Sequence, residues 1–310
     1  MQETVTVKAP CKINLFLNIK EKLENGYHNM DMVMQSLSFS DTITIKKRND
    51  GSGIKVLCQS CCVPKDKSYI IYRCTNAFFK ATGIIDNNIT IEVINRIPHE
   101  AGLGGGSADG AGVLVGLNKL YGLNLTKTKL CEIGVTVGAD IPFCIMGGTA
   151  KVSGIGDNIE AINSNMKYFV IVAKPASMSV KTPEAFKLYD SMQTKSMEDS
   201  SPMINAILKN DLSLMANLCY NSFSHALNIP QCNDITKIFK DFGSLGGCMT
   251  GSGSAVFGIF ESKKTANNAL AELKSKDYIC FFSKPVSYGA IITYYIKTGV
   301  YFIIKGTLSS

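Results

Sequence analysis

The chain has 310 residues, of which 45% are hydrophobic and 18% are charged, a composition typical of a folded globular protein rather than a disordered one. The formal net charge of +7 is spread along the chain without a basic patch interleaved with aromatic residues, so we expect no nucleic-acid partner. Eleven cysteines accompany an N-terminal segment that lacks an apolar signal sequence, which predicts a cytoplasmic protein with reduced thiols.

In the first half of the chain, segments rich in β-branched residues predict strands, and amphipathic patterns predict helices. The expected strands are Thr4–Val7, Ile13–Ile19, Thr42–Ile45 and Ile89–Val93, with a break at Lys8–Pro10. The expected helices are Tyr69–Ala81, Ser107–Leu120 and Thr126–Val137. Gly122 is well placed to end the second of these helices, because glycine commonly follows a helix C-terminus.

The second half of the chain also mixes helical and strand patterns. The expected strands are Phe169–Ala173 and Ala255–Phe260, and the expected helices are Met203–Leu218, Asn233–Phe242 and Lys264–Ser275. The polar segment Thr194–Pro202 predicts an exposed loop. These patterns predict an α+β architecture with two lobes, which we place at residues 1–160 and 161–310.

The C-terminal segment Ser287–Lys305 is unusually apolar, but Lys297 and Gly299 interrupt it. A membrane-spanning helix needs about 20 largely uncharged residues, so we expect a pair of terminal strands and no membrane partner.

Cys58, Cys61 and Cys62 form a cluster similar to a CxxC motif. A zinc site requires a second pair or nearby histidines at suitable spacing, and none follows, so we predict no structural zinc there.

The most informative stretch is a glycine-rich loop at Pro98–Ala108, between the predicted strand Ile89–Val93 and a predicted helix. Gly102 and Gly104–Gly106 have no Cβ, so the backbone can adopt positive φ and several N–H groups can converge on one phosphate. The loop lacks both the Gly-Lys-Ser/Thr sequence of a Walker A motif and the layout of a Rossmann fingerprint. A flexible turn without a ligand is the alternative, since a run of glycines alone is weak evidence.

Three segments, in order along the chain, resemble the motifs of the GHMP small-molecule kinases, named for galactokinase, homoserine, mevalonate and phosphomevalonate kinases. They are Lys8–Leu17, Pro98–Asp109 and Gly246–Phe257. The resemblance implies a two-lobed α+β fold with a deep cleft between the lobes. It also implies ATP-dependent phosphorylation of an alcohol group on a small molecule.

Three further segments, Asn25–His28, Gly138–Phe143 and Gly147–Gly156, resemble one branch of that family. This branch phosphorylates an alcohol linked to cytidine diphosphate (CDP) in non-mevalonate isoprenoid (terpenoid) biosynthesis. The resemblance therefore implies a CDP-linked alcohol as the small-molecule substrate.

Some residues depart from the pattern of this branch. Tyr69 stands where an asparagine near the adenine is usual, and Cys11 replaces a common alanine. His99 and Glu100 replace a small apolar pair, which places the charge of Glu100 near the phosphates. We therefore expect the contacts to the nucleotide to differ from those of the family.

By the same resemblance, the ATP phosphates lie over Gly102–Ser107, and Mg²⁺ bridges their oxygens with Ser107 as its protein ligand; the alternative role of Ser107 is to cap the helix. Asp140 is expected to take or orient the proton of the attacking hydroxyl, with Lys12 close to it. The nucleotide-binding residues so implied are Pro98, His99, Glu100, Ala101, Gly102, Leu103, Gly104, Gly105, Gly106, Ser107 and Ala108.

Tyr27 and His28 are implied to hold the cytosine, because an aromatic ring stacks on the flat base and polar groups satisfy its edge. Phe186 is expected at the opposite face of the base, and Asn14 near the sugar alcohol or its phosphate. The loop Gly246–Ser254 is expected to pack on the first glycine loop and to close over the diphosphate. The substrate-binding residues so implied are Asn14, Tyr27, His28, Phe186, Gly251 and Ser252.

Two other functions stay open at this point. Another kinase of the family could accept homoserine or a mevalonate-type alcohol, although neither has a cytosine for Tyr27 and His28 to hold. A non-catalytic relative could bind ATP and a metabolite without turnover, but it would not need both Lys12 and Asp140. The sequence leaves a monomer and a homodimer equally open.

Overall fold

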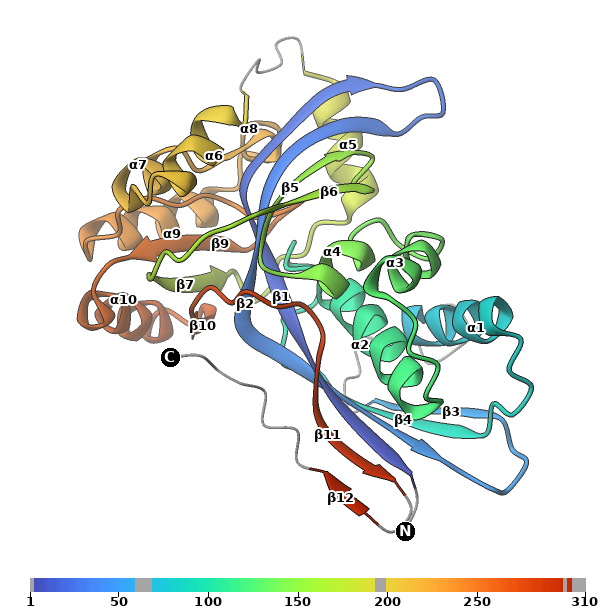
Figure 1. Ribbon diagram of the computed structural model, residues 1–310. Coiled ribbons are helices and arrows are strands. Elements are labelled where there is room, and N and C mark those ends of the chain that lie inside the picture. Colours follow the sequence, from blue (N-terminus) through green and yellow to red (C-terminus); the bar gives the residue numbers. More distant parts are fainter. Residues whose placement is uncertain (1–2, 59–68, 193–198, 298–299, 303–310) are drawn as a thin grey trace.

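The computed structural model describes residues 3–58, 69–192, 199–297 and 300–302, which form one large and one small β-sheet flanked by helices (Figure 1). The large sheet has the order β12-β11-β1-β2-β4-β3, with β5 and β6 attached to β2 and with β8 attached to β1. The small sheet has the order β10-β7-β9. Its strands come from the second half of the chain.

The strands of the large sheet are β1 (Thr4–Lys22), β2 (His28–Lys47), β3 (Ile54–Cys58), β4 (Ile89–Ile94), β5 (Thr149–Gly154), β6 (Asn158–Ile162), β8 (Tyr220–Asn221), β11 (Ile291–Lys297) and β12 (Val300–Phe302). Those of the small sheet are β7 (Phe169–Lys174), β9 (Val256–Phe260) and β10 (Ile279–Ser283). The six predicted strands are confirmed. The predicted break at Lys8–Pro10 is wrong, because a register shift between Pro10 and Lys12 lets β1 continue past the proline.

The helices are α1 (Ile70–Thr82), α2 (Gly105–Leu120), α3 (Lys127–Val135), α4 (Ile141–Met146), α5 (Thr182–Asp190), α6 (Ser201–Leu208), α7 (Leu212–Asn217), α8 (Ser222–Leu227), α9 (Pro230–Asp241) and α10 (Lys263–Ser275). The predicted α1, α2, α3, α9 and α10 are confirmed. The single predicted helix Met203–Leu218 is wrong: Asn210 has a φ of +56°, and the side chain of Asp211 then caps α7 by accepting from the Leu214 N–H at 2.9 Å.

The predicted loop Thr194–Pro202 is wrong at its end, because α6 already begins at Ser201. Ser200 is buried just before this helix, and its hydroxyl donates to Asp31 Oδ1 at 2.6 Å. The hydrogen bond fixes the start of α6 against β2. Residues 193–198 lie outside the described part of the chain.

The predicted terminal strand pair is confirmed for β11 and β12, and β11 also pairs antiparallel with β1. Residues 291–297 and 300–302 therefore return to the sheet of the first half, as the red strands β11 and β12 show in Figure 1. The lobe boundary near residue 160 stays a prediction. Among the described helices, none combines the length and apolar character needed to cross a membrane.

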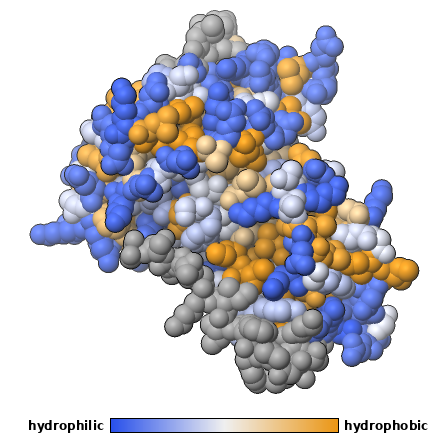
Figure 2. All heavy atoms as spheres, viewed as in Figure 1, coloured by the Kyte–Doolittle hydropathy of each residue, from blue (hydrophilic) through white to orange (hydrophobic). Residues whose placement is uncertain are grey.

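Buried hydrophobic residues form two clusters, and the long strand β1 contributes to both. Val7 and Ile13 pack in the first cluster, while Leu17 and Ile19 pack in the second. One continuous strand pair thus anchors both halves of the molecule. Figure 2 shows hydrophilic residues over much of the visible face, with apolar residues gathered at the lower right, where α1–α4 lie in Figure 1.

Helix α2 packs directly on the large sheet through two of its glycines. A Cβ added at Gly112 would come within 2.3 Å of Ile43 Cδ1, and one at Gly116 within 2.8 Å of Ile45 Cδ1. The glycines therefore permit a close approach that larger residues would prevent. This packing holds the N-terminus of α2 in place beside the glycine-rich loop.

Candidate active site

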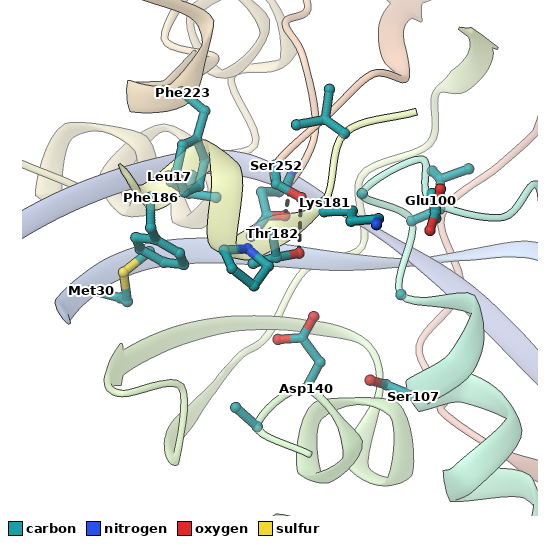
Figure 3. A pocket seen from close by; sticks show the side chains of 18 of the residues that line it. Leu17, Met30, Glu100, Ser107, Asp140, Lys181, Thr182, Phe186, Phe223 and Ser252 are labelled. Atoms are coloured by element: carbon teal, nitrogen blue, oxygen red, sulfur yellow. Dashed lines mark hydrogen bonds between the residues drawn. The ribbon is translucent and has the colours of Figure 1, made fainter. Parts of the chain in front are cut away.

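A cleft of about 1060 Å³ runs from the glycine-rich loop to the tip of the β1–β2 hairpin. One wall is made by the loop, by Asp140 and by Ser107, and the other by the start of α5 and the second glycine loop (Figure 3). Every predicted site residue lines this cleft except Ala108, which is buried in the core beneath it.

The first glycine loop uses positive φ where the chain enters α2. Gly102 has a φ of +74° and Gly104 a φ of +69°, and Gly104 occupies the N-cap position of α2. Ser107 lies one turn further on and points toward the cleft (Figure 3). The capping alternative for Ser107 is therefore wrong, because the side-chain-less Gly104 holds that position.

The two glycine loops meet backbone to backbone. A Cβ on Gly102 would lie 2.0 Å from the carbonyl oxygen of Thr250, and one on Gly251 would lie 2.8 Å from the carbonyl oxygen of Gly102. The Ala255 N–H donates to the Ala101 carbonyl at 3.2 Å. The predicted packing of the second loop on the first is present in the structure, and glycine is required on both sides.

Lys12 and Asp140 face each other at the floor of the cleft. Lys12 Nζ lies 3.6 Å from Asp140 Oδ2, and the lysine side chain is 5% exposed while that of the aspartate is 35% exposed. Asp140 directly precedes α4 but makes no capping hydrogen bond, so its carboxylate projects into the cleft (Figure 3). Lys12 lies on β1, and its backbone N–H donates to the Leu103 carbonyl at 3.0 Å.

Asn14, predicted to bind the sugar alcohol or its phosphate, is already engaged by protein groups. Its Oδ1 accepts from Lys12 Nζ at 2.7 Å and from the Gly251 N–H at 3.1 Å. Its backbone N–H donates to Thr250 Oγ1 at 3.0 Å. In the structure Asn14 therefore joins Lys12 to the second glycine loop, and its contact with substrate stays a prediction.

The other end of the cleft is aromatic. Tyr27 sits at the hairpin tip and is 60% exposed, whereas the neighbouring His28 is buried. The imidazole stacks on Phe186, with ring centroids 4.6 Å apart and planes at 16°, and Phe186 meets Phe223 edge-on at 5.0 Å. His28 thus covers one face of Phe186, and the predicted stacking of a base on Phe186 stays a prediction.

Comparison with known proteins matches two successive parts of the chain. Residues 69–148 match the family model described as GHMP kinases N terminal domain, and residues 203–279 match GHMP kinases C terminal. The chain is 36% identical over 287 residues to a 4-diphosphocytidyl-2-C-methyl-D-erythritol kinase of Acetivibrio thermocellus, which covers 92% of this chain and 100% of the relative. The chain belongs to the GHMP kinase family. A protein of the same name from Caldicellulosiruptor saccharolyticus is 38% identical over 270 residues, covering 86% of this chain and 92% of the relative.

Solved structures confirm the predicted GHMP kinase fold. A crystal structure of 4-(cytidine 5'-diphospho)-2C-methyl-D-erythritol kinase matches with a TM-score of 0.75 and 25% identity, covering 90% of this chain and 98% of that one. The homoserine kinase of Cytophaga hutchinsonii matches with a TM-score of 0.76 but only 17% identity, covering 94% and 98%. The second match supports the fold alone. Membership in this kinase family implies ATP as a substrate.

In this GHMP kinase, helix α5 contributes cleft residues that the sequence analysis missed. Thr182 Oγ1 and Ser252 Oγ lie 3.1 Å apart and share a hydrogen bond, which ties the start of α5 to the second glycine loop. Lys181 extends toward the side of the cleft that carries Glu100 (Figure 3). The Thr-Pro pair at 182–183 was the available signal, because proline favours the first turn of a helix.

Asp190, at the end of α5, is a further residue that the sequence analysis missed. It accepts from Lys22 Nζ at 2.6 Å and lies 2.7 Å from His28 Nε2. Partial desolvation would raise the pKa of Asp190, but the hydrogen bonds from Lys22 and His28 outweigh this and lower it. No sequence motif could identify this contact, because it joins a hairpin to a helix about 160 residues later.

The departures from the family pattern lie at or just behind the end of the cleft formed by the first glycine loop. Tyr69 is buried, with its hydroxyl donating weakly to Cys58 Sγ at 3.9 Å, and it does not line the cleft. Cys11 is fully buried, and burial raises the pKa of its thiol, which suits a small structural residue. Within the described residues, no group of three histidine, cysteine, aspartate or glutamate side chains could hold a metal, while Cys61 and Cys62 lie outside those residues.

Proposed function

We propose that this GHMP kinase transfers the terminal phosphoryl group of ATP to the 2-hydroxyl of 4-diphosphocytidyl-2-C-methyl-D-erythritol, a step of non-mevalonate isoprenoid biosynthesis. One observation carries the proposal: a single cleft holds a glycine phosphate loop, the Lys12–Asp140 pair and the Tyr27–His28 segment. The relatives of this name cover nearly the whole chain at 36–38% identity. Homoserine and mevalonate would leave the aromatic end of the cleft empty.

The residues divide the work by their position in the cleft. Backbone N–H groups around Gly104 and the N-terminus of α2 hold the ATP phosphates. Asp140 orients the acceptor hydroxyl and takes its proton, while the ammonium of Lys12 at 3.6 Å balances the carboxylate charge. Phosphoryl transfer depends mainly on such positioning and charge stabilisation, so the arrangement supplies what the reaction needs.

Mg²⁺ forms part of the proposal, because the available donors fit it. Ser107 and Asp140 present oxygen atoms toward the same part of the cleft (Figure 3). Mg²⁺ is commonly held by one or two protein oxygens together with substrate phosphates. Ser107 would hold it, and the ion would neutralise charge on the phosphate oxygens when bound.

A cytoplasmic location is part of the proposal as well. The cysteines in the described part of the chain are all free thiols, in keeping with a reducing compartment.

A coupled ADP-release assay tests the proposed activity. Purified protein is supplied with ATP and Mg²⁺ and with the CDP-linked methylerythritol, homoserine or mevalonate in parallel. We expect turnover with the CDP-linked alcohol alone. Turnover with homoserine or mevalonate instead would assign the chain to another activity of the same family, and ATP binding without any turnover would indicate a non-catalytic relative.

A further inference from the structure

The start of helix α5 is fixed beside both glycine loops. Thr182 Oγ1 and Ser252 Oγ of the second loop share a hydrogen bond at 3.1 Å. The second loop packs on the first, where a Cβ at Gly102 would lie 2.0 Å from the Thr250 carbonyl oxygen. Lys181 directly precedes Thr182, occupies the N-cap position of α5 and is exposed. The backbone of this lysine is therefore held close to the two loops.

The side chain of Lys181 reaches across the cleft from this fixed point. It extends toward the wall that carries Glu100, and Asp140 and Ser107 belong to the same wall (Figure 3). Glu100 is exposed and has a φ of +48°, at the point where the chain enters the glycine run. The ammonium of Lys181 therefore faces the part of the cleft to which the proposed function assigns the ATP phosphates.

The positive charge of Lys181 is available to a ligand, whereas that of Lys12 is engaged. Lys12 Nζ lies 3.6 Å from Asp140 Oδ2 and donates to Asn14 Oδ1 at 2.7 Å. Lys181 has no ion-pair partner among the residues that the structure describes. An anion in the cleft can thus recruit this ammonium without breaking an existing pair.

Glu100 increases the need for a cation on the opposite wall. Its carboxylate adds negative charge beside the expected phosphates, and like charges repel each other. Lys187 also lines the cleft from α5, but it is next to Phe186 at the aromatic end. Lys181 is the α5 lysine that extends toward Glu100, so it can offset this charge.

We propose that Lys181 is a catalytic residue whose ammonium binds the phosphoryl group during its transfer. The inference rests on the proposed function and adds a residue to it. In the transfer, the acceptor oxygen bonds to the terminal phosphorus, the bond from this phosphorus to the bridging oxygen of ADP breaks, and the acceptor proton passes to Asp140. Negative charge is then spread over the oxygens of the moving group, and a nearby ammonium stabilises it.

Steady-state kinetics of Lys181→Met test the proposal. The variant keeps the length of the side chain but removes its charge, so kcat should fall about 10- to 100-fold while the KM for ATP stays within about threefold. Lys181→Arg keeps the charge and should recover most of the loss. Because Lys181 is exposed, both variants should fold as the parent does. An unchanged kcat in Lys181→Met would overturn the inference.

Lys263→Met is the matched control. Lys263 is also an exposed lysine at the start of a helix, α10, and it does not line the cleft. Its replacement removes the same charge from the protein as a whole, so kcat should stay at the parent value. An equal loss of kcat in Lys263→Met and Lys181→Met would show that net charge, rather than a contact in the cleft, is responsible, and would contradict the proposal.

A binding measurement separates the transferred group from the rest of the nucleotide. The affinity for ADP is measured by calorimetry with the CDP-linked alcohol present, with and without aluminium fluoride, which mimics the phosphoryl group in transfer. Fluoride should tighten ADP binding in the parent, because a transition-state analogue binds more tightly than a ground-state ligand. In Lys181→Met the affinity for ADP alone should stay within about twofold, while the gain from fluoride should fall about 10-fold.

Two results would contradict the proposal in different ways. An equal loss of ADP affinity with and without fluoride would show that Lys181 holds ADP rather than the transferred group. If the parent turns over the CDP-linked alcohol and Lys181→Met does so equally well, this inference fails while the proposed function stands. If the parent shows no turnover in the ADP-release assay, the proposed function fails, and the inference fails with it.

Discussion

The two ends of the cleft are built in opposite ways. At the phosphate end the chain presents backbone, and Gly102 and Gly251 allow two loops to touch without side chains between them. At the other end it presents aromatic side chains, with Tyr27 and His28 from the hairpin and Phe186 from α5. The first end offers N–H groups that any phosphate can use. The second offers an aromatic surface, which we propose holds the cytosine.

This difference separates chemistry from specificity. Solved structures with the same fold carry the names homoserine kinase and mevalonate kinase, so this fold serves acceptors that differ widely from one another. Substitutions at the phosphate end should therefore slow phosphoryl transfer to any acceptor. Substitutions at the aromatic end should damage only the use of its own acceptor.

The largest effect is expected between the two ends, at Asp140. Replacing Asp140 with Asn removes the proton acceptor but keeps the shape of the side chain, so kcat should fall by about 10²- to 10⁴-fold. ATP binding, measured separately by calorimetry, should stay close to the parent value. If kcat stays within about twofold of the parent, Asp140 has no part in proton transfer.

A backbone change at the phosphate end should come next. In Gly102→Ala the new methyl group would lie 2.0 Å from the Thr250 carbonyl oxygen, so the two glycine loops must separate. We expect kcat/KM to fall about 100-fold, because small displacements at a phosphate site are costly. Gly83→Ala is the control, since Gly83 has a similar φ of +70° but nothing within 4 Å. Equal losses in both variants would show that positive φ, rather than loop contact, is responsible.

The aromatic end should give a selective effect. Tyr27→Ala removes a ring that is 60% exposed, so stability should hardly change. If the ring stacks on cytosine, the KM for the CDP-linked alcohol should rise about 10-fold, whereas the KM for ATP should stay constant. Tyr27→Phe keeps the ring and should behave as the parent does. A rise in the KM for ATP would indicate that Tyr27 contacts ATP rather than the CDP-linked alcohol, which contradicts the prediction.

The smallest effect is expected beneath the phosphate end, in stability rather than in rate. Burial, together with the nearby charge of Asp41, raises the pKa of Asp109 well above its usual value. A raised pKa in the folded state means that stability is fully present in acid and is lost as pH rises through that pKa. Asp109→Asn removes this loss of stability, so at pH 8 the variant should melt at a higher temperature than the parent. The increase should be about 2–4 °C for each kcal/mol of unfolding free energy regained, and it should be smaller at pH 5. The same difference in melting temperature at pH 8 and at pH 5 would show that the protonation of Asp109 does not contribute to the pH dependence of stability.

The same contrast explains what the sequence could predict. The phosphate loop, Lys12 and Asp140 lie in short local motifs, and the glycines report directly on backbone conformation, so these residues could be placed in advance. Asp190 and Thr182 could not, because their contacts depend on how α5 packs on the hairpin, which no local pattern encodes. Helix α4 has only six residues, too short for a helical period to show. The prediction of a strand break at Lys8–Pro10 was wrong for a related reason, because a bulge depends on the partner strand, here β2.

A crystal structure with a non-hydrolysable ATP analogue and the CDP-linked alcohol is the most direct test. The account predicts the terminal phosphate between Gly102 and Ser107, with the acceptor oxygen about 2.6–3.2 Å from the Asp140 carboxylate. It also predicts the cytosine beside Tyr27 and His28. A terminal phosphate bound elsewhere, or an acceptor oxygen on the far side of the cleft from Asp140, would contradict it.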